Sequence, residues 1–222
     1  VNFYRDGEQG TRGEGEITKE KVTQRFHDSR AKICKGRVHI IKDYIDVGDT
    51  CLDVGAGAGT FANFLKKHVK SVDCTELDPR LINECKNLGF KAYEGDFLKI
   101  DFENKYDIVF LWHVLEHIED VNEVMRKIYE ICNKRVFIEV PTLLTLLDMA
   151  ADGETRRGPP VYPPPFRRGY RRLSSPNNGH YDGHCHYFSQ ESFKELAKNH
   201  NFKIKELKEG VQTPALFALL EK

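Results

Sequence analysis

A short apolar run that leads directly into three glycines constrains the fold more than any other feature of this chain. Residues 51–54 are apolar enough for a buried strand, and Gly55, Gly57 and Gly59 follow at every second position. A helical pattern resumes at residues 60–68. Strand, glycine turn and helix in this order are typical of a parallel sheet in which a ligand comes close to the backbone of the turn.

The alternation of strands and helices continues along the chain. The pattern predicts further strands at residues 71–76, 91–93, 106–111 and 136–140, and helices at residues 17–45, 79–88, 121–132 and 189–199. Ser189 is the expected N-cap of the last helix. Two more strands, at residues 202–207 and 215–220, are joined by a turn around Glu209 and Gly210. We therefore predict an α/β fold, with a doubly wound, seven-stranded, mostly parallel sheet that ends in an antiparallel hairpin.

The length of 222 residues favours one domain. The polar, glycine-containing residues 1–16 predict a flexible arm before a domain that spans residues 17–222. Residues 152–183 interrupt the regular pattern with six prolines and six arginines and form an expected insertion over the substrate site.

The overall charge excludes a protein that coats nucleic acid with its whole surface. Lys plus Arg and Asp plus Glu both number 34, so the net charge is zero. No apolar run approaches the roughly 18 residues of a membrane span. The six cysteines are scattered without a CxxC pair, and we recognise no targeting segment. We therefore expect a cytoplasmic protein that does not enter a membrane; its oligomeric state stays open.

The acidic residue at the end of the second strand indicates the type of ligand. A carboxylate such as that of Glu76 accepts both hydroxyls of a ribose in folds of this kind, so we predict a nucleoside-containing cofactor. The nicotinamide pattern G-x-G-x-x-G is incomplete, because Thr60 stands where the third glycine would be. An NAD-dependent oxidoreductase remains an alternative.

Several segments together resemble the class I S-adenosylmethionine-dependent methyltransferases, in particular the ubiquinone-biosynthesis O-methyltransferases and the methyltransferase type 11 and type 23 groups. The matching segments are LDVGAGAG at 52–59, TELDP with Glu76, EGDF at 94–97, YDIVFLWHVLEHIED at 106–120, and the terminal hairpin. The resemblance runs from about residue 40 to the C-terminus and implies S-adenosylmethionine as the cofactor.

The resemblance also implies roles for individual residues. Gly55 and Gly57 accommodate the methionine half of the cofactor, Glu76 binds the ribose, and Asp96 with Phe97 holds the adenine. Trp112 and His113 are placed near the sulfonium, although core packing is an equal alternative for Trp112. The complete set of expected cofactor residues is Asp53, Gly55, Gly57, Gly59, Glu76, Leu77, Asp96, Phe97, Trp112 and His113.

Methyl transfer to oxygen or nitrogen requires alignment of the acceptor and, where the acceptor is protonated, a base. The catalytic candidates are three histidines, the residue type that titrates near neutral pH: His113, His117 and His186. Forked guanidinium groups favour an acceptor with phosphate or carboxylate. We therefore expect O- or N-methylation of a small anionic metabolite, bound by Arg167, Arg168, Tyr170, Arg171 and His184.

A metal site is a second interpretation of the same histidines. His113, Glu116 and His117, with His184, offer nitrogen and oxygen ligands. The small-RNA 3′-end 2′-O-methyltransferases use a similar E-x-x-E-H pattern, in which His113 here replaces the first Glu. We expect no metal and no nucleic-acid partner, but a metal-assisted RNA 2′-O-methyltransferase remains an alternative. A cofactor-binding protein without catalysis is another.

Overall fold

The computed structural model describes residues 19–142, 184–209 and 215–222, with side chains described from residue 30 onward. The chain divides into two compact units, residues 1–110 with 131–134 and residues 111–130 with 135–222. The division falls within two strands, β4 (Tyr106–Trp112) and β5 (Cys132–Pro141). The expected arm at residues 1–16 and the insertion at residues 152–183 lie outside the described residues, so both boundaries stay predictions.

The first unit contains the glycine turn. Parallel pairs join β1 to β2 and β2 to β3. Pro79 opens α3 at a position that needs no backbone donor, and the side chain of Asp78 caps this helix. The elements of this unit before β4 are α1 (Lys19–Ile41), η1 (Lys42–Tyr44), β1 (Thr50–Val54), α2 (Thr60–Leu65), β2 (Ser71–Glu76), α3 (Pro79–Asn87), β3 (Lys91–Glu94) and η2 (Phe97–Lys99).

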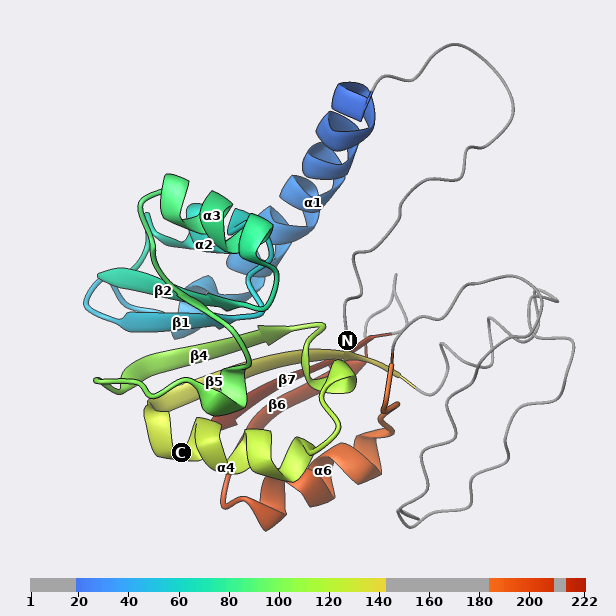
Figure 1. Ribbon diagram of the computed structural model, residues 1–222. Helices are drawn as coiled ribbons and strands as arrows, with labels where there is room; N and C mark the ends of the chain where they lie inside the picture. The colour runs from blue at the N-terminus through green and yellow to red at the C-terminus, as the bar shows by residue number, and fades with distance from the viewer. Residues whose placement is uncertain (1–18, 143–183, 210–214) are drawn as a thin grey trace, which may run out of the picture. The chain divides into compact units, whose positions relative to one another are not determined.

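The second unit holds the C-terminal hairpin. Its β7 pairs in antiparallel fashion with both β5 and β6. The helices α4 and α6 lie side by side (Figure 1), and His200 and Phe202, which follow α6, contact Asn122 and Tyr129 of α4. The new elements are η3 (Leu115–His117), α4 (Val121–Ile131), α6 (Gln190–Asn199), β6 (Lys203–Glu209) and β7 (Ala215–Glu221).

The seven strands form one sheet in the order β3-β2-β1-β4-β5-β7-β6. The predicted α/β fold, with a seven-stranded sheet and antiparallel strands at its C-terminal end, is confirmed. After β3 the chain returns to place β4 on the other side of β1. The carboxyl end of β1, where the glycine turn begins, is therefore a topological switch point, the position at which open α/β sheets bind ligands.

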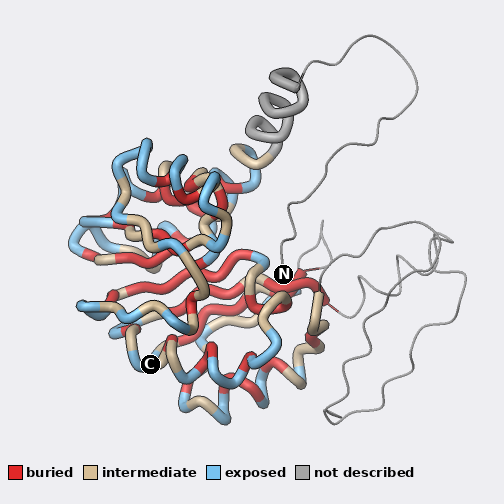
Figure 2. The backbone as a smooth tube through the Cα atoms, in the orientation of Figure 1, coloured by how far each residue is buried: buried red, intermediate tan, exposed pale blue. Residues whose placement is uncertain are grey.

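Burial follows the apolar pattern of the sequence. Residues 108–111 of β4 are completely buried, as expected for a strand that is covered on both faces. Figure 2 shows the central strands as mainly buried, whereas the edge strands β3 and β6 are intermediate or exposed. The capping box of α6 is present, because Ser189 and Ser192 each accept a hydrogen bond from the other's backbone N–H. No helix among the described residues is sufficiently long and apolar to cross a membrane.

Several predicted boundaries are wrong by a few residues. The helix predicted for residues 17–45 ends at Ile41, and the one predicted for residues 60–68 ends at Leu65. β5 begins at Cys132, within the predicted helix 121–132 and before the predicted strand 136–140. β6 spans Lys203–Glu209, so Glu209 lies in the strand and not in the predicted turn. The apolar pattern does not predict a strand where the residues are polar and their partners lie far away in sequence. The first residues of β5 are of this kind.

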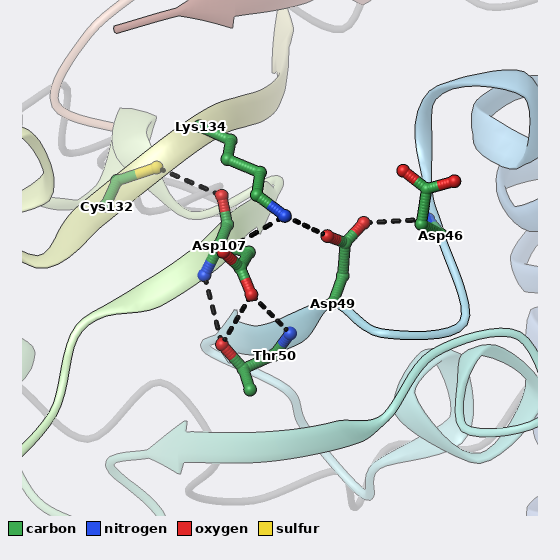
Figure 3. A network of polar contacts seen from close by, with 6 residues as sticks. All are labelled: Asp46, Asp49, Thr50, Asp107, Cys132 and Lys134. Carbon is green, nitrogen blue, oxygen red and sulfur yellow. Dashed lines mark hydrogen bonds and ion pairs between the residues drawn. The ribbon is translucent and has the colours of Figure 1, made fainter.

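Lys134, one of those polar residues in β5, belongs to a network at the start of β1 (Figure 3). Its Nζ lies 2.7 Å from Asp49 Oδ1 and 3.2 Å from Asp107 Oδ1. Asp49 is completely buried and also accepts the Asp46 N–H at 2.7 Å, and Asp107 Oδ2 accepts both the N–H and the hydroxyl of Thr50 at 3.0 Å. Lys134 therefore neutralises a buried carboxylate and joins the beginnings of three strands.

We expect the Lys134→Met variant to unfold with a free energy about 2 kcal/mol below that of the wild type, because Asp49 then keeps a buried charge without its cation. The side chain of Lys134 is about half exposed, which reduces the loss below that of a fully buried pair. Urea denaturation measures the difference. The control is Lys105→Met at an exposed position, and equal loss of stability in both variants would contradict the role of the network.

Candidate active site

The glycine turn after β1 has a backbone that glycine alone adopts without strain. The φ angles of Gly55, Gly57 and Gly59 are 65°, 58° and 73°. A Cβ atom on Gly59 would lie 3.1 Å from the sulfur of Cys85, and one on Gly57 would lie 3.1 Å from Nη1 of Arg30. The backbone conformation of the turn therefore disfavours larger residues, and at Gly59 the packed Cys85 side chain also leaves little space.

The carboxylate of Glu76 holds this turn to the end of β2. Its Oε2 accepts the Gly57 N–H at 2.8 Å, and its Oε1 accepts the N–H groups of Leu77 and Asp78 at 2.8 Å and 3.1 Å. The backbone carbonyl of Glu76 accepts the Gly95 N–H at 2.9 Å. One residue thus connects the segments that follow β1, β2 and β3.

Two further predicted residues stand next to these segments. Leu77 is 67% exposed, which is unusual for a large apolar side chain and leaves its surface available to a ligand. The carboxylate of Asp96, which follows Gly95, accepts the Leu98 N–H at 3.0 Å and is partly exposed. Phe97, in contrast, is buried and packs on Phe102 at 5.9 Å between ring centroids, so its side chain supports the turn from within.

Asp53 is a buried carboxylate in the last part of β1. Its Oδ2 has no hydrogen-bond partner among the described residues. Burial raises the pKa of Asp53 to about 7, the nearby Arg37 opposes this shift, and Glu76 adds to it. An unpaired, buried carboxylate oxygen fits a ligand that brings a positive charge.

The structure adds two arginines that the sequence analysis missed. Arg30 and Arg37 of α1 are seven residues apart and so lie on one face of the helix. Nη1 of Arg30 stands beside Gly57, and the charge of Arg37 acts on Asp53. Their helical spacing is visible in the sequence, but nothing there connects this face to the glycine turn.

His113, at the end of β4, lies in the second unit and has the unusual φ angle of 56°. Its ring nitrogens Nδ1 and Nε2 lie 3.2 Å from Glu116 Oε1 and 2.8 Å from Glu139 Oε1. Its backbone N–H donates to the backbone carbonyl of Glu139. Burial by itself lowers the pKa of His113, but the two carboxylates outweigh it and raise the pKa to about 9. An imidazole held in this way donates to both carboxylates; its catalytic and cofactor roles stay predictions.

Glu116, His117 and His184 form a second group in this unit. The side chain of Glu116 is completely buried, and its Oε1 lies 4.0 Å from Nε2 of His117. The rings of His117 and His184 meet edge to face at 4.8 Å. The structure therefore brings together residues that lie far apart in the sequence.

The remaining predicted site residues lie in the core, on a neighbouring loop or outside the described residues. Trp112 is buried and stacks on Phe217 at 6.3 Å, which supports the core-packing alternative. Nε2 of His186 is 3.1 Å from the carbonyl oxygen of Glu119. The expected acceptor residues Arg167, Arg168, Tyr170 and Arg171 lie outside the described residues, so the structure leaves their role untested.

Two curated relatives match the chain over about half of its length. The malonyl-[acyl-carrier protein] O-methyltransferase of Calditerrivibrio nitroreducens is 24% identical over 115 residues, which are 47% of this chain and 44% of the relative. The ribosomal protein L11 methyltransferase of Staphylococcus carnosus is 30% identical over 107 residues, which are 44% of this chain and 33% of the relative. The matches thus span less than half the length of either relative.

A solved structure matches nearly the whole chain. The magnesium protoporphyrin IX methyltransferase of Synechocystis PCC 6803, with bound SAH, superposes with a TM-score of 0.64 at 14% identity, over 95% of this chain and 90% of that chain. At this identity the likeness concerns the fold. The family model described as a methyltransferase domain matches residues 25–207, and the chain therefore belongs to the methyltransferase-domain family, as its sequence predicts.

Proposed function

We propose that this methyltransferase transfers a methyl group from S-adenosylmethionine to an oxygen or nitrogen atom of a small anionic acceptor. The observation that carries the cofactor assignment is the glycine turn tied to the Glu76 carboxylate at the switch point of the sheet. The structural neighbour with bound SAH, the product of such a transfer, supports the same cofactor.

The nucleoside half of the cofactor matches the residues at the ends of β2 and β3. A carboxylate accepts about four hydrogen bonds, and Glu76 accepts three from the residues that the structure describes. Its Oε2 keeps an acceptor position for a ribose hydroxyl. Leu77 offers an apolar surface for the adenine ring, and the partly exposed carboxylate of Asp96 accepts from the adenine amino group.

The charges around the glycine turn match the methionine half, which carries an ammonium and a carboxylate group. Asp53 offers the ammonium an oxygen that has no partner in the described part of the chain, and Arg30 stands beside the turn with a guanidinium for the carboxylate. Glycines in the turn let the ligand reach the backbone. The first unit therefore offers a partner for each polar part of the cofactor.

The sulfonium of the cofactor supplies an electrophilic methyl group, so the chain itself has to align the acceptor and remove its proton. The predicted bases His113, His117 and His186 all belong to the second unit. Because both ring nitrogens of His113 already donate to carboxylates, we propose the base among His117 and His186. The arginines at 167, 168, 171 and 172 are the proposed contacts of the anionic group, because the guanidinium fork matches phosphate and carboxylate.

A screen of phosphate-, carboxylate- and sugar-nucleotide-bearing acceptors, scored by release of S-adenosylhomocysteine, tests the acceptor class. With the best acceptor, replacing Arg167, Arg168, Arg171 and Arg172 by alanine should raise KM by about tenfold or more at low salt, because forked ion pairs are lost. Calorimetry should show unchanged affinity for S-adenosylhomocysteine.

The control variant removes four exposed lysines, at positions 42, 105, 198 and 203, and so changes the net charge equally. An equal rise of KM in both variants would show that the net charge of the protein, and not a specific contact of the arginines, determines KM. Turnover of an RNA oligonucleotide but of no small anion would favour the RNA alternative, and cofactor binding without any turnover would favour a non-catalytic protein.

A further inference from the structure

Three side chains of the second unit converge on one point. Glu116, His117 and His184 each offer one ligand atom, and these atoms lie within 4.8 Å of one another. We propose that they bind a divalent transition-metal cation of the Zn²⁺ type. The sequence pattern left this site as an alternative, and the tertiary structure supplies the argument for it.

The strongest argument is the state of the Glu116 carboxylate. Its side chain is completely buried, its Oε1 contacts His113, and its Oε2 has no hydrogen-bond partner among the described residues. A buried carboxylate oxygen without a partner destabilises the folded chain, because its charge has lost its hydration. A cation at Oε2 supplies the missing partner.

The spacing of the three ligand atoms suits such a cation. Ligands bound at about 2.0–2.2 Å in a tetrahedral site lie about 3.4 Å apart. The atoms here are within 4.8 Å before any ion draws them together. His117 and His184 are only partly buried, so rotation of their rings can close the remaining gap.

The two segments that carry the ligands are fastened to each other through the backbone. The carbonyl oxygen of Glu116 accepts the N–H groups of Cys185 and His186 at 2.7 Å and 3.2 Å. The thiol of Cys185 donates to the His117 carbonyl at 3.7 Å. His184 is therefore held next to the turn that carries Glu116 and His117. This preorganisation lowers the entropic cost of bringing the three ligands together around a metal.

His113 and Glu139 fix the orientation of the buried Glu116 carboxylate. His113 bridges Glu116 Oε1 and Glu139 Oε1, at 3.2 Å and 2.8 Å, and leaves Oε2 of Glu116 for the cation. Hydrogen-bonded partners of this kind fix the direction of a metal-binding carboxylate. His113 is thus a positioning residue for the proposed site and not one of its ligands.

The donor set indicates the class of metal. Two imidazoles and one carboxylate are ligands of Zn²⁺, Co²⁺ and related ions, whereas Mg²⁺ and Ca²⁺ prefer sites made of oxygen. Three protein ligands leave at least one coordination position for a further oxygen or nitrogen atom. In a methyltransferase this position suits the acceptor hydroxyl, whose pKa a bound cation lowers. This catalytic part rests on the proposed function; metal binding does not.

Cobalt titration of the full chain, after removal of metals with a chelator, tests the site without an activity assay. We expect one Co²⁺ per chain, with the visible absorption bands of a low-symmetry, nitrogen-containing site, and displacement of Co²⁺ by Zn²⁺. The variants Glu116→Gln, His117→Ala and His184→Ala should each weaken Co²⁺ binding by about tenfold or more. His200→Gln, which alters another histidine of the same unit, should bind Co²⁺ as the wild type does.

Far-UV circular dichroism establishes which variants are folded. If Glu116→Gln does not fold, His117→Ala and His184→Ala decide the result, because their side chains are partly exposed. Absence of stoichiometric Co²⁺ binding, or wild-type binding by folded ligand variants, would overturn the proposal. Calorimetry of S-adenosylhomocysteine binding to the metal-free chain tests the cofactor assignment separately, so the two proposals fail independently.

Discussion

Replacing Glu76 with alanine should weaken the binding of S-adenosylhomocysteine by about 100-fold. The variant loses the carboxylate that the ribose needs and also leaves the N–H groups of Gly57, Leu77 and Asp78 without their acceptor. Hydrogen bonds to a charged group contribute roughly 1.5–3 kcal/mol each, and about 1.4 kcal/mol corresponds to a tenfold change in affinity. Isothermal titration calorimetry measures the loss directly.

The control for this experiment is Asp78→Ala in the same turn. Asp78 caps α3 by accepting the Arg80 N–H at 2.8 Å, so its removal should cost about 1 kcal/mol of stability but leave the affinity within about twofold. Glu76→Gln keeps the shape of the side chain without its charge and should fall between alanine and wild type. If Glu76→Ala and Asp78→Ala weakened binding equally, loss of local order would explain the effect, and the assignment of Glu76 to the ribose would be lost.

The contribution of Asp53 to the free energy of unfolding, measured without cofactor, should decrease as the pH rises from about 4 to about 7 and then stay constant. Burial raises the pKa of Asp53 from 3.8 to about 7, so in this window the folded chain keeps a proton that the unfolded chain has released. The linkage relation makes this a loss of about 4 kcal/mol over the window. Asp53→Asn cannot ionise and should be more stable than the wild type by a similar amount at pH 8, as measured by urea denaturation.

Binding of S-adenosylhomocysteine should depend on pH in the opposite direction. The ammonium group of the ligand pairs with the ionised form of Asp53, so the affinity should rise as the pH passes about 7 and a proton should leave the protein on binding. Calorimetry in buffers with different ionisation enthalpies counts this proton. The control Asp101→Asn, at an exposed position, should behave as the wild type. The same pH dependence in Asp53→Asn would show that another group is responsible.

The sequence alone determines the fold and indicates most residues of the candidate cofactor site. Short apolar runs that alternate with helical patterns specify the strands, and the glycines after β1 record a backbone conformation that depends on the residues themselves. Glu76 ends β2 and Asp96 follows β3, and the carboxyl ends of parallel strands lie at one edge of a sheet. These are local rules, so they can be read without knowledge of distant contacts.

Only the tertiary structure decided the electrostatic partners. The sequence shows that His113 and Glu116 are three residues apart, but not that Glu139 completes a bridge. It also does not show that Glu116 is buried with one oxygen that lacks a partner among the described residues. It likewise gives no sign that Arg30 reaches Gly57. The physical reason is that a pKa and the cost of a buried charge depend on burial and on groups that are distant in sequence, whereas secondary structure follows largely from neighbouring residues.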